Sequence, residues 1–165
     1  MIAYKWLRPD GTSVFTRFRW PLPDGGPGEW VEAPQALCRS GIHACRAGDL
    51  PYWVGRALYE IELDGPIVEE PTKVVAERGR LLRRIDAWDD ALRAEYTRMC
   101  ADRGIELVRG AGLPPGWETA LEGSIPEGPA LLGFMAARAA EQISGVDGYY
   151  AERARQTAWL VERLA

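Results

Sequence analysis

Hydrophobic and polar residues alternate most regularly over residues 57–65. Three apolar side chains fall on one face of an extended chain and two carboxylates on the other: Tyr59, Ile61 and Leu63 against Glu60 and Glu62. The pattern predicts a strand with one buried face and one solvated face. The turn-forming residues 64–66 are expected to end it.

Further short extended segments flank this strand. They cover 3–7, 13–20, 29–33, 67–71, 73–77 and 79–85. Turn signals at 9–11 and a Pro/Gly-rich loop at 21–28 separate the first three, which is typical of hairpin structure. We therefore expect residues 1–85 to form a small mixed or antiparallel sheet.

The period changes to that of a helix after residue 85. Asp86 is a suitable N-cap for a helix that extends to about residue 102, with Trp88, Leu92, Tyr96 and Met99 along one side. Gly104 is placed to end this helix, and a short strand is expected over 105–108.

The last third predicts a loop followed by two helices. Residues 109–129 are rich in Gly and Pro, so we expect a loop there, between an α+β core at 1–108 and a C-terminal helical pair at 130–165. Pro129 suits a first helical turn, and the second helix is expected from Asp147. The fold class is α+β, in one domain overall.

Composition limits the class of protein. The chain has 165 residues, of which 47% are hydrophobic and 27% charged, as expected for one globular domain with a substantial core. The net charge of -4 argues against general binding of duplex nucleic acid, which requires a cationic surface. No segment resembles a signal peptide or a membrane span, so we expect a cytoplasmic protein with reduced cysteines.

The segment LCRSGIHAC contains most of the candidate chemistry. Cys38, His43 and Cys45 are residue types that bind zinc, and Cys100 is a fourth candidate. Their spacing is wider than that of common zinc knuckles, and Cys100 on a helix suits a small buried hydrophobe. Cys45 beside His43 also suggests a cysteine nucleophile, against the alternative that both residues pack within a sheet.

Charged residues after the main strand form a second candidate group. Glu69 and Glu70 precede Pro71 and are candidates for carboxylates that point into a cleft, although such a pair is more often a solvated edge. The run Arg78, Arg80, Arg83 and Arg84 suits bidentate phosphate contacts, and equally suits the protection of an exposed sheet edge.

Two resemblances follow from these motifs. LCRSGIHACRAGDLPYW, followed by ALYEIELDGPIV and KVVAERGRL, resembles uncharacterised bacterial and phage proteins that share a Gly-[apolar]-His-x-Cys core. More weakly, the order of motifs resembles the ADP-ribosyltransferase fold, in particular rifamycin ADP-ribosyltransferases and RNA 2'-phosphotransferases. In that alignment His43 takes the place of a strand tyrosine, with Asp49 and Trp53 after it.

The second resemblance implies a nucleotide or NAD site and transfer of ADP-ribose. It implies that His43 lies against the nicotinamide ribose, that Glu69 or Glu70 orients the acceptor, and that arginines bind the pyrophosphate. The first strand lacks the family's histidine, and Tyr4, Lys5 and Arg8 are the candidate substitutes there. The implied cofactor contacts are Tyr4, Trp53, Arg78 and Arg80.

Two alternatives from other classes stay open. One is a non-catalytic interaction protein, with a partner surface or homodimer contact on the C-terminal helices. The other is a protein that binds metal through cysteine and histidine. The residues do not specify the substrate, the acceptor, the oligomeric state or the pathway.

Overall fold

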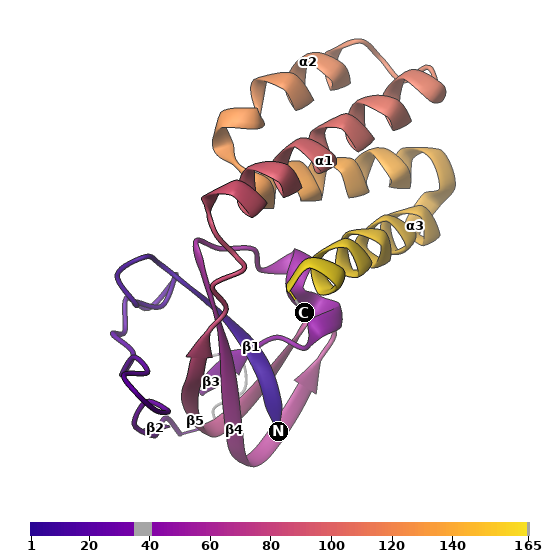
Figure 1. Cartoon of the computed structure of the whole chain (residues 1–165). Helices are drawn as coiled ribbons and strands as arrows, with labels where there is room; N and C mark the ends of the chain where they lie inside the picture. Colours follow the sequence, from indigo (N-terminus) through magenta and orange to yellow (C-terminus); the bar gives the residue numbers. More distant parts are fainter. Residues whose placement is uncertain (35–40, 165) are drawn as a thin grey trace. The chain divides into compact units, whose positions relative to one another are not determined.

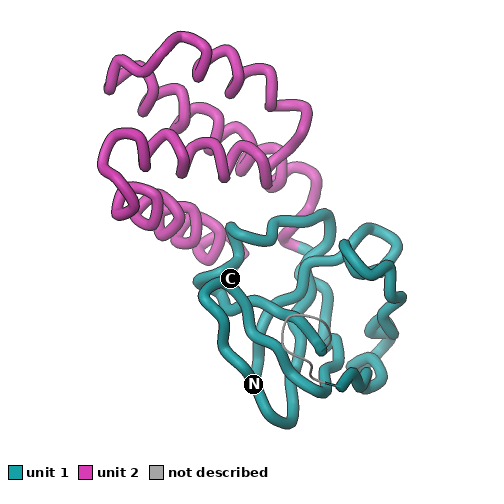
Figure 2. Tube along the Cα trace, turned by 180° about the vertical axis from the view of Figure 1, so that it is seen from behind, with its two compact units in different colours: residues 1–86 teal, residues 87–165 magenta. Residues whose placement is uncertain are grey.

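The computed structural model describes residues 1–34 and 41–164 of the chain. These residues form two compact units, Met1–Asp86 and Ala87–Ala165 (Figure 2). The predicted α+β fold is confirmed, with 47% helix and 26% strand, and an antiparallel sheet precedes the helices. None of the helices in the described part is both long and apolar enough to cross a bilayer.

Unit 1 contains the sheet. Within the described residues its strands are β1 (Ile2–Leu7), β2 (Val31–Glu32), β3 (Ile42–Ala44), β4 (Ala57–Glu70) and β5 (Lys73–Arg84), with a 3-10 helix η1 (Ala47–Tyr52) after β3 (Figure 1). The strand order is β1-β4-β5-β2, and β3 pairs with β5 beside β2. All these pairings are antiparallel, and the long β4–β5 hairpin is the centre of the unit.

The sheet closes on itself between β1 and β3. Tyr4 and Cys45 exchange two backbone hydrogen bonds, each of 2.8 Å between nitrogen and oxygen. The two edges β1 and β3 therefore meet, and β1, β4, β5 and β3 enclose a small interior.

The interior holds the core of unit 1. Its apolar members come from alternating positions, as the period of two requires, and they include Ala3, Leu7, Trp20, Ile42, Ala44, Tyr59, Ile61, Leu63, Val74, Ala76 and Leu81. Removing large aliphatic side chains from water stabilises the unit by roughly 2 kcal/mol for each one fully buried.

Two expectations for unit 1 differ from the structure. β4 does not end at residues 64–66 but continues to Glu70, because an irregularity between Asp64 and Ile67 absorbs the turn residues and Gly65 has φ +79°. Residues 13–20 form turns and isolated bridges in place of a regular strand. There Arg17 has a φ of 61°, which is incompatible with extended pairing.

Unit 2 is helical. In the part of it that the structure describes, the elements are α1 (Asp90–Gly110), α2 (Gly116–Gly123), a 3-10 turn η2 (Ile125–Glu127) and α3 (Pro129–Leu164) (Figure 1). α3 has non-helical backbone angles at Ser144 and Gly145, so it consists of two helical limbs. These limbs correspond to the predicted C-terminal helical pair.

The helix boundaries differ from the predicted ones. Asp89 caps α1 in place of Asp86, and its carboxylate accepts a 2.7 Å hydrogen bond from the Leu92 amide. α1 continues through Gly104 and through 105–108, where a strand was expected. Within 109–129, where a loop was expected, the chain forms α2 and η2.

Polar side chains are buried where α1 packs against α3. Gln156 is fully buried, and its amide nitrogen donates to the Gly133 carbonyl and to Glu152 Oε1, both at 3.0 Å. Its amide oxygen accepts from Arg153 Nη1 at 3.0 Å and from the Tyr96 hydroxyl at 3.4 Å. Because these buried groups have partners, the network is compatible with a stable helical core.

Candidate functional site

The end of the β4–β5 hairpin gathers charged and aromatic side chains from three elements. We call this group the hairpin-end cluster, and its members are His43, Arg46, Trp53, Glu69, Glu70 and Lys73. Four of them were candidate site residues from the sequence, namely His43, Trp53, Glu69 and Glu70. β3 and η1 reach the hairpin end because β3 pairs with the first residues of β5.

His43 points away from the core. Its neighbours Ile42 and Ala44 are buried in the sheet interior, so strand alternation places the imidazole on the outer face, where it is half-buried. Burial lowers the pKa of His43 below its usual 6.5, and the charges of Lys73 and Lys5 lower it further, while Glu70 opposes them. The imidazole is therefore neutral at pH 7 and has a nitrogen that accepts hydrogen bonds.

Arg46 connects η1 to the hairpin end. Its guanidinium donates to Asp49 Oδ2 at 2.5 Å, to Glu69 Oε2 at 2.9 Å, and to the carbonyls of Glu70 and Pro71 at 2.8 and 3.1 Å. Asp49 is buried and also accepts from the Arg46 backbone amide at the start of η1. The arginine thus fixes the hairpin end with its planar set of donors.

Both predicted carboxylates have cationic partners. Glu70 is 3.1 Å from the Lys73 ammonium, and Glu69 is bound by Arg46. A carboxylate held in an ion pair has to leave its partner before it can take a proton from a bound substrate. With Asp49, which also pairs with Arg46, three carboxylates face two cations here.

Trp53 and Tyr4 lie on either side of β3 in the chain and are both anchored. The Trp53 indole donates to the Thr72 carbonyl in the turn between β4 and β5, at 2.6 Å. Tyr4 pairs with Cys45, two residues after His43. Trp53 is therefore bound to the hairpin turn, and Tyr4 is paired with the residue that follows β3.

Arg78 and Arg80 are not part of this cluster. They lie farther along β5, opposite Asp64 and Glu62, and both guanidinium groups stack on Trp30 at 4.8 and 4.7 Å from the ring centre. Arg78 also pairs with Asp64 and Glu32, and Arg80 with Glu62. Their hydrogen-bonding capacity is directed at carboxylates of the sheet, so their predicted contact with pyrophosphate needs exchange of these partners.

The structure describes Cys45, whereas Cys38, the other cysteine of the LCRSGIHAC segment, lies outside the described residues. Cys45 is buried, its thiol is 3.4 Å from the Tyr4 carbonyl, and burial raises its pKa to about 12. A thiol of this kind stays protonated at neutral pH and is a poor nucleophile. Among residues 1–34 and 41–164 no three His, Cys, Asp or Glu side chains are grouped to hold a metal ion.

Sequence reasoning missed Arg46 and Lys73 near His43, and it had considered Lys5 only as a substitute for the first-strand histidine. Lys5, Arg46 and Lys73 supply the cations that act on His43 or its neighbours. Arg46 and Asp49 have the i, i+3 spacing of a helix N-terminus, which is a signal present in the sequence. Lys5 alternates with Ala3 and Leu7 in a buried strand, and no local pattern indicates what its ammonium contacts.

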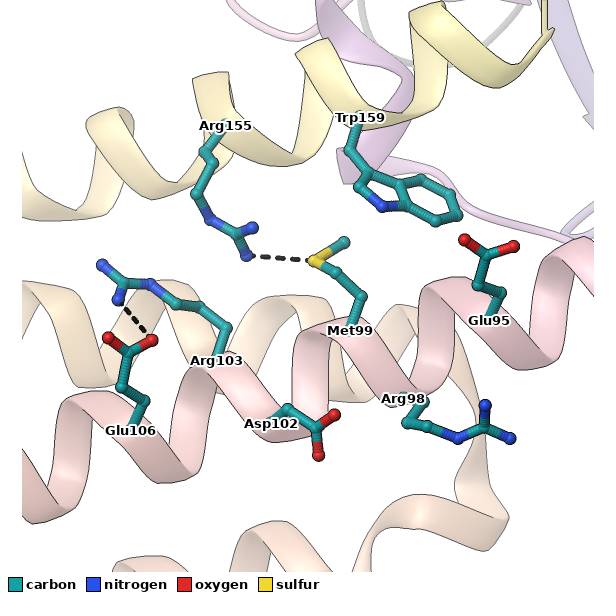
Figure 3. Close-up of a pocket in the computed structure, with 8 residues that line it drawn as sticks. All are labelled: Glu95, Arg98, Met99, Asp102, Arg103, Glu106, Arg155 and Trp159. Carbon is teal, nitrogen blue, oxygen red and sulfur yellow. Dashed lines mark hydrogen bonds and ion pairs between the residues drawn. The ribbon is translucent and has the colours of Figure 1, made fainter.

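Unit 2 has a shallow hollow of about 470 Å³ between α1 and the second limb of α3 (Figure 3). Arg155 and Met99 point toward one another across it, and Arg103 pairs with Glu106 at 2.8 Å (Figure 3). The arginines in its lining are matched by an equal number of acidic residues: Arg98, Arg103 and Arg155 against Glu95, Asp102 and Glu106. This balance selects neither an anion nor a cation.

The partner surface expected on the C-terminal helices stays a prediction. Several large apolar side chains on α3 are exposed: Leu131, Phe134, Ile143, Val146, Tyr150 and Val161. They are distributed over both limbs of α3.

Comparisons with protein families, with curated protein sequences and with solved structures gave no match. The resemblance to ADP-ribosyltransferases therefore rests on the sequence motifs alone.

Proposed function

We propose that unit 1 binds a nucleotide of the NAD class at the hairpin-end cluster. The observation that carries the proposal is the grouping of His43, Glu70 and Lys73, with the Arg46 guanidinium bound to the Glu70 carbonyl. The motif order had associated the histidine and the glutamate with one site, and their strands are separated along the chain. The two cations were not anticipated from the sequence.

The chemistry of the cluster suits such a ligand. A dinucleotide has phosphate oxygens, which Lys73 and Arg46 bind in exchange for their partners Glu70 and Glu69, and ribose hydroxyl groups, which donate to an acceptor. The neutral imidazole of His43 is that acceptor. Trp53, held through its indole nitrogen, offers an aromatic surface beside the hairpin end.

The pairing of the carboxylates favours binding over group transfer. Glu69 and Glu70 both have cationic partners, so neither is free to take a proton from an acceptor. Transfer of ADP-ribose requires one of these ion pairs to open when ligand and acceptor bind. Nucleotide binding is therefore the core of the proposal, and transfer is a further step that depends on it.

Titration calorimetry with NAD, ADP-ribose and nicotinamide tests the proposal on the full chain. We expect heat with NAD and with ADP-ribose, because both have the pyrophosphate, and weak or no heat with nicotinamide. His43→Ala and Lys73→Met are expected to weaken NAD binding by about tenfold each, as loss of one polar contact does.

Arg84→Ala is the matched control. Arg84 is an exposed cation of the same hairpin that pairs only loosely with Asp86, at 3.6 Å, and its removal is expected to leave affinity unchanged. The proposal is wrong if millimolar NAD gives neither heat nor thermal stabilisation of the wild-type protein. An equal loss of affinity in Arg84→Ala would also contradict it, because the effect would then be general electrostatic attraction.

A further inference from the structure

Lys5 is a lysine inside the closed sheet. It lies between Ala3 and Leu7 on the core face of β1 and is 8% exposed. Its ammonium donates to the backbone carbonyl of His43 at 2.5 Å. It also lies 4.7 Å from the centre of the Trp20 ring.

These two contacts offset part of the cost of placing a charge in an apolar core. Removing an ammonium from water is costly unless polar partners replace the water. A backbone carbonyl and the face of an indole ring are both such partners. The remaining ionisable groups around it are the Cys45 thiol at the end of β3, the His43 imidazole on the outer face, and the Tyr59 hydroxyl on β4, opposite Lys5 in register.

The carbonyl that Lys5 binds belongs to the histidine of the proposed site. β3 is only three residues long, and its pairing to β5 involves Ile42, His43 and Ala44 alone. A strand this short has few backbone hydrogen bonds to fix its orientation. The Tyr4–Cys45 backbone pair holds the chain just after β3, and the charged hydrogen bond from Lys5 adds a contact at its middle residue.

We propose that Lys5 is a positioning residue for His43, which holds the His43 peptide from inside the sheet and so fixes the direction in which the imidazole points outward. The ammonium and the imidazole act on opposite faces of the same residue. The role in ligand binding rests on the proposed function, whereas the structural tie between the two residues does not depend on it.

Nuclear magnetic resonance tests the tie without any ligand. His43 is the only histidine of the chain, so one set of imidazole signals reports it alone. The His43 carbonyl carbon reports the hydrogen bond from Lys5 directly. The test compares wild type, Lys5→Met, which keeps an unbranched side chain of similar size, and Lys73→Met.

Lys73→Met is the matched control. Lys73 lies outside the sheet interior, and its charge, like that of Lys5, lowers the pKa of His43 in the wild-type protein. We expect the imidazole pKa to rise in both variants. Only Lys5→Met is expected to shift the His43 carbonyl resonance upfield and to speed hydrogen exchange at Ala44. An NAD titration of Lys5→Met is expected to show affinity weaker by about tenfold.

The wild-type protein supplies a second measurement should Lys5→Met not fold. Burial lowers the pKa of Lys5 to about 8, so the His43 carbonyl signal is expected to change with a midpoint near that pH. An unchanged carbonyl signal across this range, or equal shifts in the two variants, would overturn the proposal. If NAD does not bind wild type but these shifts appear, the proposed function fails and the tie stands.

Discussion

Gly104 and Leu121 are in such close contact that a β-carbon at residue 104 would lie 2.7 Å from the Leu121 Cδ2 atom. Both residues are buried, and the contact joins the middle of α1 to α2. It explains why a glycine occurs inside a helix, where it costs about 1 kcal/mol relative to alanine. The absence of a side chain at 104 allows α2 to approach α1.

Gly104→Ala is expected to destabilise unit 2 by about 1 kcal/mol. The gain in helix propensity is outweighed by overpacking of about 1–3 kcal/mol, because Leu121 is buried and has little room to move. Urea unfolding followed by circular dichroism at 222 nm measures the change. Gly110→Ala is the control, since its added carbon has no described atom within 4 Å outside its chain neighbours and the backbone of its own helix, and this variant is expected to be more stable. Equal stabilisation in both variants would contradict the packing argument.

Glu152 is expected to make unit 2 sensitive to acid. Its carboxylate is almost fully buried and accepts from Arg155 at 2.8 and 2.9 Å and from Gln156. Burial alone raises the pKa of Glu152, but the hydrogen bonds from Arg155 and Gln156 outweigh burial and hold the pKa below 4.5. A lowered folded-state pKa contributes stability above the unfolded value, and this contribution is lost as pH falls below 4.5.

The measurement for Glu152 compares wild type with Glu152→Gln. The glutamine keeps the shape of the side chain but does not ionise, so its unfolding free energy is expected to fall less steeply between pH 5 and pH 3. At pH 7 we expect the variant to be less stable by about 1–3 kcal/mol, because a charged hydrogen-bond acceptor is lost. Parallel pH profiles for the two proteins would show that other carboxylates control the acid response.

Lys5 is expected to make unit 1 more stable at alkaline pH. Burial lowers its pKa from 10.5 to about 8, so between these values the unfolded chain binds a proton that the folded chain does not. Stability therefore rises with pH across this window, by roughly 3 kcal/mol at most. The buried thiols of Cys45 and Cys100, with pKa values raised to about 12, act in the opposite direction above pH 9. The difference between wild type and Lys5→Met isolates the lysine, and tryptophan fluorescence in urea measures it from pH 7 to 9.5.

Cys45 and Cys100 are expected to resist alkylation in the folded protein. Both are buried free thiols, so little thiolate exists at neutral pH and reagents have no access. In a Cys38→Ser background, maleimide labelling followed by peptide mass analysis should give little product before unfolding and complete labelling in denaturant. Rapid native labelling of Cys45 would contradict its burial beside Tyr4.

Strands with strict alternation were predictable from local pattern. Tyr59, Ile61 and Leu63 all lie in the interior, as their spacing requires. The continuation of β4 past Gly65 was not predictable, because a bulge and a turn have the same residue preferences. The pairing of residues 67–70 with the start of β5 decides between them, and sequence periodicity does not encode this pairing.

The bounds of the helices in unit 2 were hard to predict from sequence, because they also depend on contacts between residues far apart in the chain. Gly104 has the composition of a helix end, and only the approach of Leu121, 17 positions away in the chain, explains its place inside α1. For the candidate site, His43 and Glu70 were identified as members of one group. Their cationic partners were missed, because Arg46 and Lys73 come into place through pairing between β3, η1 and the hairpin.

The reciprocal pairing of Tyr4 with Cys45 also affects behaviour in concentrated solution. Exposed strand borders recruit strands of other molecules, which leads to domain exchange and fibrous aggregates. Here the outer border of β1 is occupied by Cys45 of the same chain. Intramolecular closure therefore protects this border from association with further copies.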